Sequence, residues 1–286
     1  MNPTPEKEKQ NMKKFLALML ALMMALSMVA CGNNQPTDDA NKGDAQNDAD
    51  TQLTYAVEAG SAGEAVANEK GWKITSVGSQ ADALMEVASG TSDAAIIDLL
   101  MADAMVGENT SYPDLKVGEE KLTTELYGVG CRKGSDLAAF INSVLAESYA
   151  DGSMAEIAKT YGVSESALVE QPAAAEEFVA AAEGSDVKYI QDKGKLIVGI
   201  TEFAPMDFKD QDDQWVGFDA DMAKKVAEKL GVEVEFVVIE WDMKTNELDS
   251  KNIDCVWNGM TLTDGVLAAM ECSNAYCNNA QVVITK

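Results

Sequence analysis

The chain has 286 residues, a formal net charge of −26, five cysteines and no histidine. This length is enough for two modest lobes after an N-terminal targeting segment. Strong acidity argues against partners such as nucleic acid and against broad binding to anionic lipid. Because histidine is missing and the cysteines lack CxxC spacing, an ordinary metal site is not expected. The sequence shows no catalytic constellation and no phosphate-binding loop, so we expect neither an enzyme nor a bound cofactor.

The first 50 residues read as a targeting segment followed by a tether. Lys13 and Lys14 precede an apolar run and then small residues that end at Cys31, which is typical of a secretory signal peptide over residues 1–30. The segment before Cys31 resembles a lipobox, in which the cysteine is lipidated; the alternative is a plain signal peptide with an incidental cysteine. Residues 32–50 are polar, so 31–50 are expected to form a disordered, lipid-anchored tether.

From residue 53 the pattern alternates between strands and helices. Strands are expected at 53–58, 72–77 and 93–97, and helices at 61–70, 81–90 and 99–106. Alternation of this kind predicts βαβ units and a mostly parallel sheet. A crossing strand at 126–132 and helices at 135–150 and 153–161 follow. Residues 163–185, rich in Ala and Glu, are expected to be a linker.

The remaining residues begin a second series of strands and helices. Strands are expected at 196–201, 233–240, 253–257 and 281–285, with helices at 219–230 and 243–250. Cys255 lies within an apolar strand and is expected to be a small core residue. Cys272 and Cys277 could form a disulfide in an exported protein; the sequence does not decide which of the thiols are oxidised.

Two segments resemble the amino-acid-binding proteins of ABC importers, the family 3 solute-binding proteins. Residues 199–221, from Gly-Ile-Thr-Glu-Phe-Ala-Pro to Gly-Phe-Asp-Ala-Asp-Met, resemble the opening strand and helix of that family. Residues 56–64, Ala-Val-Glu-Ala-Gly-Ser-Ala-Gly-Glu, resemble the start of its second lobe. In the family the first segment precedes the second, and here it follows. The resemblance implies an α/β, two-lobe fold of the periplasmic-binding-protein type II, circularly permuted.

The permuted order implies a particular layout of the two lobes. Residues 51–126 would form the family's second lobe, and residues 127–286, including the linker, its first lobe. The lobes would then be covalently joined once, near residues 126–130. Thr51 and Lys286 would lie close together near the hinge.

The resemblance also implies a set of ligand-binding residues in the first lobe. Phe203, before Ala-Pro, and Trp241, after the next strand, would face each other across the ligand. The segment 257–263 resembles the loop that meets the backbone groups of an amino acid. There the carbonyl of Asn258 or Gly259 would accept from the α-ammonium, and Thr261 would donate to the α-carboxylate. The alternatives are that both aromatics are core residues and that the loop is a routine turn with Thr263 as a helix cap.

The second lobe would contribute an anion site and an acid. Ser61 and Ala62, at a helix start, would meet the α-carboxylate through backbone N–H groups. Asp98 corresponds to the acid that pairs with the α-ammonium; alternatively it caps the helix that follows. One position departs from the family, because Val266 stands where an arginine would form a fork with the α-carboxylate.

These features predict an exported binding protein, lipid-anchored to the outer face of the cytoplasmic membrane. It would capture a small polar solute, implied by the resemblance to be an amino acid, between its lobes and present it to ABC permease subunits. Two alternatives stay open: a binding-defective or sensory relative, and a dehydratase of small acids on the same fold.

Overall fold

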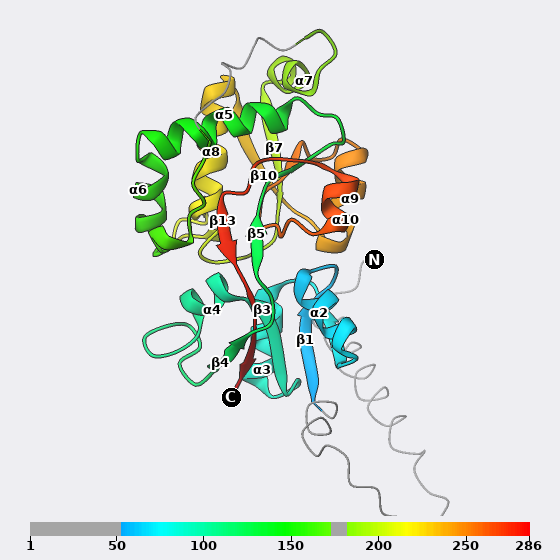
Figure 1. Cartoon of the computed structure of the whole chain (residues 1–286), viewed down its shortest axis with the longest axis vertical. Helices are drawn as coiled ribbons and strands as arrows, with labels where there is room; N and C mark the ends of the chain where they lie inside the picture. The colour runs from blue at the N-terminus through cyan, green and yellow to red at the C-terminus, as the bar shows by residue number, and fades with distance from the viewer. Residues whose placement is uncertain (1–52, 173–181) are drawn as a thin grey trace, which may run out of the picture. The chain divides into compact units, whose positions relative to one another are not determined.

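The structure, a computed structural model, describes residues 53–172 and 182–286. The predicted signal peptide, Cys31 and the tether lie outside these residues. Two five-stranded sheets with flanking helices are joined by two neighbouring strands (Figure 1). We call the unit around β1–β4 and β14 the smaller lobe, and the unit around β7 and β10 the larger lobe. This arrangement confirms the predicted α/β fold with two lobes.

The sheet of the smaller lobe has the order β2-β1-β3-β14-β4. Its strands are β1 (Thr54–Glu58), β2 (Lys73–Val77), β3 (Ala94–Asp98), β4 (Lys116–Lys121) and β14 (Gln281–Thr285). β1 pairs in parallel with β2 and β3, whereas β14 runs antiparallel to β3 and β4. Helix α2 (Ala62–Lys70) covers one face of the sheet and α3 (Gln80–Ser89) the other, so β3 is buried along its whole length. Helix α4 (Leu99–Met105) follows β3 directly.

Both long helices of the smaller lobe begin and end where the sequence supplies capping residues. The hydroxyls of Ser61 and Ser79 accept hydrogen bonds from backbone N–H groups in the first turns of α2 and α3. Gly71 and Gly90 end these helices in the left-handed conformation, which a glycine adopts without steric cost. The caps hold the start of α2 in place beside the end of β1.

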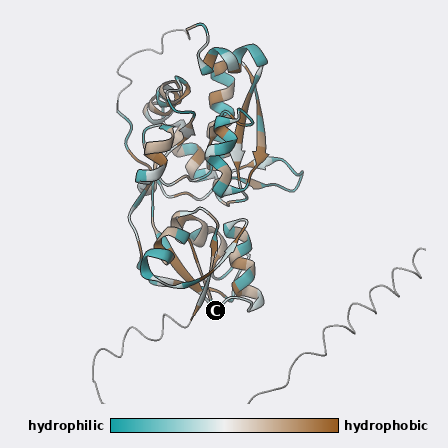
Figure 2. Ribbon diagram, turned by 90° about the vertical axis from the view of Figure 1, so that its right-hand side faces the viewer, coloured by the Kyte–Doolittle hydropathy of each residue, from teal (hydrophilic) through white to brown (hydrophobic). Residues whose placement is uncertain are grey.

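The sheet of the larger lobe has the order β10-β7-β11-β6-β12. Its strands are β6 (Gly130–Cys131), β7 (Lys195–Ile200), β10 (Glu233–Val238), β11 (Cys255–Val256) and β12 (Glu271–Cys272). Helices α5 (Leu137–Ala150) and α8 (Phe218–Leu230) pack on one face, and α9 (Lys244–Asp249) and α10 (Asp264–Ala269) on the other. Strand colours in Figure 2 are mostly hydrophobic, while the helices carry long hydrophilic stretches.

The rest of the larger lobe consists of short elements around this sheet. They are α6 (Ser153–Thr160), η1 (Glu165–Ala167), α7 (Asp186–Lys193), the hairpin of β8 (Phe208–Lys209) with β9 (Trp215–Val216), and η2 (Trp241–Met243). Buried Asp254 links several of these parts, since its carboxylate lies 3.3 Å from Arg132 and 2.6 Å from Lys193 and accepts from the Ile197 N–H. A buried carboxylate is stable only when it is paired in this way.

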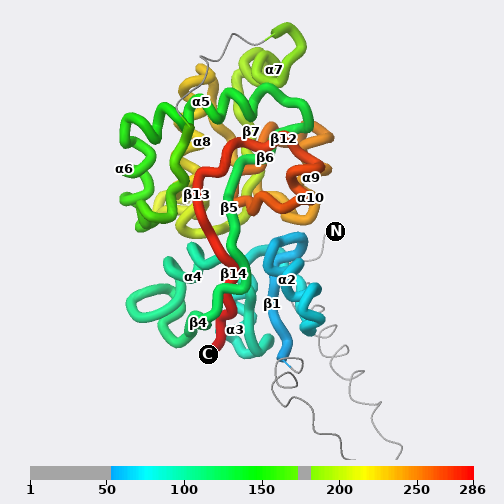
Figure 3. The backbone as a smooth tube through the Cα atoms, in the orientation of Figure 1, coloured from blue at the N-terminus to red at the C-terminus, as the bar shows by residue number. Residues whose placement is uncertain are grey.

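Two antiparallel strands connect the lobes, not one. They are β5 (Glu125–Tyr127) and β13 (Cys277–Asn279), and they run side by side between the lobes (Figure 3). The prediction of a single connection near residues 126–130 is therefore wrong. The prediction that all of 127–286 lies in one lobe is also wrong, because β14 inserts between β3 and β4 of the smaller lobe. Val282 and Ile284 are buried there, and an apolar strand pattern does not specify which sheet the strand joins.

The described ends of the chain lie at one end of the smaller lobe's sheet. Tyr55 pairs with Ala94, and Ile284 pairs with the next residue, Ala95. The start of β1 and the end of β14 therefore lie at the same end of the sheet. The opposite end of the sheet holds the carboxyl ends of β1 and β3. We expected the termini to meet near the hinge, and for Lys286 this is wrong because β14 carries the chain away from it; Thr51 lies outside the described residues.

The four cysteines of the described residues are free thiols, so the disulfide considered between Cys272 and Cys277 is not formed. Cys255 lies in the core, as its strand pattern predicted. In the same part of the chain, no helix has the length and apolar character needed to cross a membrane.

Candidate functional site

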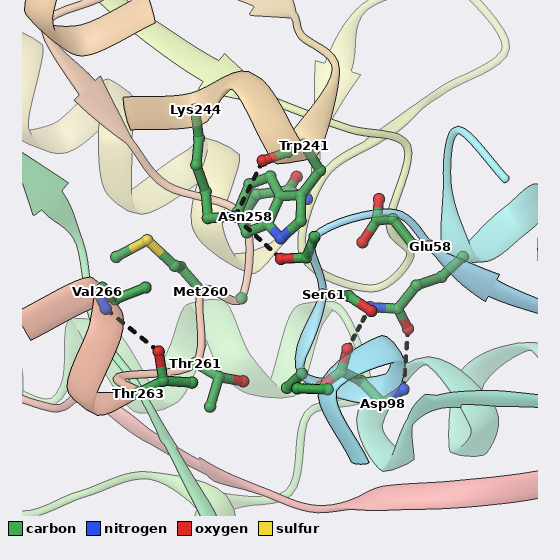
Figure 4. A pocket seen from close by; sticks show the side chains of 15 residues that line it. Glu58, Ser61, Asp98, Trp241, Lys244, Asn258, Met260, Thr261, Thr263 and Val266 are labelled. Carbon is green, nitrogen blue, oxygen red and sulfur yellow. Dashed lines mark hydrogen bonds between the residues drawn. The ribbon is translucent and has the colours of Figure 1, made fainter. Parts of the chain in front are cut away.

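A cavity of about 210 Å³ lies between the lobes, and both contribute to its walls (Figure 4). From the smaller lobe it is lined by Glu58, Gly60, Ser61, Ala62, Ala65, Gln80 and Asp98. From the larger lobe it is lined by Trp241, Lys244, Asn258, Gly259, Met260, Thr261, Thr263 and Val266. Most of these residues follow the carboxyl ends of strands, the place where open α/β sheets bind ligands.

The cavity brings together seven of the eight predicted ligand-binding residues. They are Ser61, Ala62, Asp98, Trp241, Asn258, Gly259 and Thr261. Phe203 is the exception. It is 1 % exposed and packs edge-on against Tyr127, beneath Gly259, where an added Cβ would approach its ring to 2.5 Å. The prediction that Phe203 lines the ligand site is therefore wrong; the loop after β11 covers it.

Asp98 is at the cavity wall, but its carboxylate is already occupied. It accepts hydrogen bonds from Gln80, Tyr127 (2.8 Å), Asn279 and Gln281 (2.9 Å). Burial, followed by the nearby charge of Glu125, raises its pKa to about 7. A carboxylate has about four acceptor positions, so the four donors leave little capacity for the predicted bond to an α-ammonium. Its side chain does not cap α4 either.

Glu58 is the acid with a free acceptor atom. It ends β1 and is 2 % exposed, and its Oε1 has no hydrogen-bond partner. Burial is the main cause that raises its pKa to about 8, and the charge of Asp98 adds to it, against hydrogen bonds from Thr201 and Gln80. Sequence reasoning missed this residue, although an acid at the end of a buried strand was a usable signal.

The loop after β11 is held in place by hydrogen bonds to residues of other elements. The Asn258 amide donates to the Thr201 hydroxyl at 2.7 Å, and the Gly259 N–H donates to Asp219 at 2.6 Å. The Thr261 hydroxyl donates to Glu125 at 3.0 Å. Thr263 accepts from the Val266 N–H and caps α10, as the alternative interpretation of this loop predicted.

Trp241 and Lys244 form the larger lobe's side of the cavity rim. The Lys244 ammonium donates to the carbonyls of Trp241 and Gly60, each at 3.0 Å, and lies 4.8 Å from the centre of the Trp241 ring. Burial lowers the pKa of Lys244, and the charges of Glu58 and Asp242 oppose that shift. Sequence reasoning missed Lys244, because a lysine in the first turn of a helix is usually exposed.

The lobes are in close contact at this rim. Gly60 has φ +72°, and a Cβ added to it would lie 2.7 Å from the Cα of Asp242 in the other lobe. Only a glycine allows both the backbone conformation and this approach. The structure therefore has its lobes closed over the cavity.

One part of the chain is similar to a known protein family. Residues 196–286 match the family described as bacterial extracellular solute-binding proteins, family 3. About a third of the chain is thus similar to this family. The match covers the larger lobe from β7 onward and ends with β14, so it includes Trp241 and the loop after β11.

Two curated relatives and one solved structure illustrate the similarity to family 3. The L-cystine-binding protein TcyJ of Escherichia coli is 36% identical over 26% of this chain and 29% of its own length. The arginine-binding extracellular protein ArtP of Bacillus subtilis is 33% identical over 33% and 37%. The arginine-bound ArgBP of T. maritima, residues 20–233, is 38% identical over 28% and 39%, with a TM-score of 0.28. The chain thus spans about a third of the length of these relatives.

Within the family 3 framework, Val266 is the notable difference. It lines the cavity at the place where the resemblance implied an arginine. A valine offers no donor to a carboxylate, so any recognition of an anionic group must come from other residues of the cavity.

Proposed function

We propose that this protein binds a small amino acid in the cavity between its lobes and delivers it to an ABC importer. The observation that supports this most is the cavity itself, which both lobes line, with carboxyl groups from the smaller lobe and an ammonium group from the larger lobe. Small-molecule sites are enclosed, mostly preformed spaces with a few convergent polar groups. A zwitterion is the ligand class that such walls favour.

The smaller lobe would bind the ligand's charged backbone groups. The Oε1 atom of Glu58 is unpartnered and would accept from an ammonium. The backbone N–H groups at the start of α2, next to Ser61 and Ala62, would donate to a carboxylate, because a helix N-terminus favours anions. On the other wall, Trp241 would cover the apolar part of the ligand.

A thermal-shift screen with the twenty common L-amino acids and L-cystine tests this function. At about a hundredfold excess over Kd, one or more of them should raise the melting temperature by about 5–10 °C. Trp241→Ala should abolish the shift, whereas Trp215→Ala, in the β8–β9 hairpin away from the cavity, should keep it. If no amino acid shifts the melting temperature of the wild type, the proposed amino-acid binding is wrong.

A second function is favoured by the state of Glu58. With a pKa of about 8, its carboxyl is protonated at neutral pH, as the general acid of a dehydratase would be. Incubating the purified protein with small hydroxy acids and measuring loss of water by NMR distinguishes the two. Turnover would favour the enzyme, and binding without turnover the transport protein.

We also propose that the chain is circularly permuted relative to its family. In the family order, the matched segment 196–286 would come first and residues 53–131 would come after it. The described start of β1 and the end of β14 share one edge of a sheet, with β3 between them. A short connection could therefore restore the family order.

The proposed anchor is a lipid on Cys31. Labelled palmitate should enter the wild-type protein during expression in bacteria and should be absent from Cys31→Ala, because only the thiol forms the lipid bond. The variant should also appear in the soluble extracellular fraction, since loss of the acyl chains removes the membrane affinity. Equal labelling of both proteins would rule out this lipid anchor.

A further inference from the structure

Lys244 supplies the positive charge among the side chains that line the cavity. The other charged side chains of that lining are the acids Glu58 and Asp98. Lys244 is 9% exposed. None of the ion pairs within 4.0 Å in the described residues involves it. A buried charge without a direct counter-ion is costly, and a ligand of opposite charge would compensate it.

The geometry leaves Lys244 able to bind a ligand. Its ammonium has three N–H donors, and two of them are used by the carbonyls of Gly60 and Trp241. Among the described residues, the third has no hydrogen-bond acceptor. The ammonium lies beside the face of Trp241 and, in Figure 4, reaches from α9 toward the cavity that Val266 also borders.

We propose that Lys244 is the specificity-determining residue of this cavity, and that it binds a carboxylate of the ligand and excludes cationic side chains. The proposal rests on the proposed amino-acid binding. Lys244 takes over the role that Val266 does not perform, from a different element of the same lobe. Its ammonium also lies over the face of the Trp241 ring, a position that would otherwise attract a cationic side chain of a ligand. Two like charges at that place repel each other.

A purely structural role for Lys244 makes a different prediction. The bond to Gly60 joins the two lobes, so a lysine that served only to hold them closed would affect every ligand equally. A lysine that binds a carboxylate would affect only the ligands that carry one. The comparison of amino acids with their decarboxylated amines separates the two roles.

The experiment uses calorimetry on the wild type, Lys244→Met, Lys244→Arg and Lys251→Met. Lys251→Met is the matched control, because its ammonium also lies 4.8 Å from an aromatic ring, that of Tyr189, and it does not line the cavity. The probes are the twenty common L-amino acids, L-cystine, and the decarboxylated amine of each amino acid that binds. L-Arginine and L-lysine test the exclusion of cations.

We expect the wild type to bind arginine and lysine at least tenfold more weakly than its preferred amino acid. Lys244→Met should weaken binding of the preferred amino acid roughly ten- to a hundredfold, which corresponds to the free energy of one charge-assisted hydrogen bond. It should leave the affinity for the decarboxylated amine nearly unchanged. It should also reduce the difference in affinity between the preferred amino acid and arginine. Lys244→Arg should keep the preference for carboxylates, and Lys251→Met should match the wild type. A loss confined to glutamate and aspartate would assign the contact to the side-chain carboxylate.

Two results would overturn the proposal. One is an equal loss for amino acids and amines in Lys244→Met, which would make the residue only a contact between the lobes. The other is a wild-type preference for arginine or lysine. In both cases amino-acid binding itself would stand. If the wild type binds none of the probes, the proposed function fails, and this inference fails with it.

Discussion

The free energy of unfolding of the wild-type protein should fall as the pH rises from about 5 to about 8.5, and Glu58→Gln should remove much of that fall. The pKa of Glu58 is raised from 4.5 to about 8 in the folded state. Between these values the folded protein holds a proton that the unfolded chain has released. Stability from this group is therefore complete below about pH 4.5 and is lost as the pH rises through about 8.

The expected size of the effect is large for a single side chain. Each pH unit in this interval changes the free energy of unfolding by about 1.4 kcal/mol per group, so Glu58 contributes on the order of several kcal/mol. Asp98 and Asp219, whose pKa values are also raised to about 7 by burial, add to the slope in the same direction. Glutamine has the same shape and cannot ionise, so the variant should be the more stable protein at pH 8.5.

Denaturant unfolding at a series of pH values measures this. Glu119→Gln, an exposed position on β4 of the same lobe, is the control and should reproduce the wild-type slope. Identical slopes for the wild type and Glu58→Gln would show that Glu58 titrates normally in the folded protein. A zwitterionic ligand that places its ammonium on Glu58 should lower its pKa, so binding near pH 7 should release a proton.

A chain that ends at Ala280 should lose the folded smaller lobe and all ligand binding. The deletion removes β14 from between β3 and β4 and exposes the surfaces that bury Val282 and Ile284. It also removes the Gln281 amide from Asp98 and Glu125. Each buried aliphatic side chain contributes about 1.5–3 kcal/mol, and the unpaired strands add to the loss. Since domains are stable by only about 5–15 kcal/mol, residues 54–121 should become open to hydrogen exchange and proteolysis.

A rearranged chain provides the matched control and tests the permutation. It begins at Glu183, runs to Lys286, continues through a flexible linker of about 12 residues, and then runs from Leu53 to Pro172. The linker must pass two strand spacings, about 10 Å, which a Gly/Ser chain of this length spans easily. Because this protein retains β14, it should fold and bind ligand like the wild type. Failure of the rearranged chain to fold would contradict the proposed permutation.

Local sequence signals predicted most of the individual elements. The strand that ends at Glu58, the buried β3 and helices α5 and α6 lie within one or two residues of their expected bounds. These elements are specified by patterns inside a short window, above all by the periodicity of apolar residues. The partner strand of β14 was not predictable, because pairing is decided by surfaces that lie about 180 residues apart in the chain, as between Gln281 and Asp98.

The candidate site was predictable where it depends on position along a strand, and less so where it depends on packing. Trp241 and Asn258 line the cavity because they follow strand ends. Phe203 also follows a strand, but the next loop folds over it. The occupancy of Asp98 by Asn279 and Gln281 arises only when β13 and β14 are in place. Which acid has a free oxygen is thus a property of the assembled lobes.

The position of β14 also determines when the smaller lobe can form during synthesis and export. Strands β1–β4 leave the ribosome, and then the membrane channel, more than 150 residues before β14 does. Until then β3 and β4 lack the strand that lies between them, and the edge of β3 stays open to other chains. The larger lobe needs residues only up to Cys272 for its sheet. We therefore expect it to fold first, and the smaller lobe to require protection from aggregation until residues 281–285 have crossed.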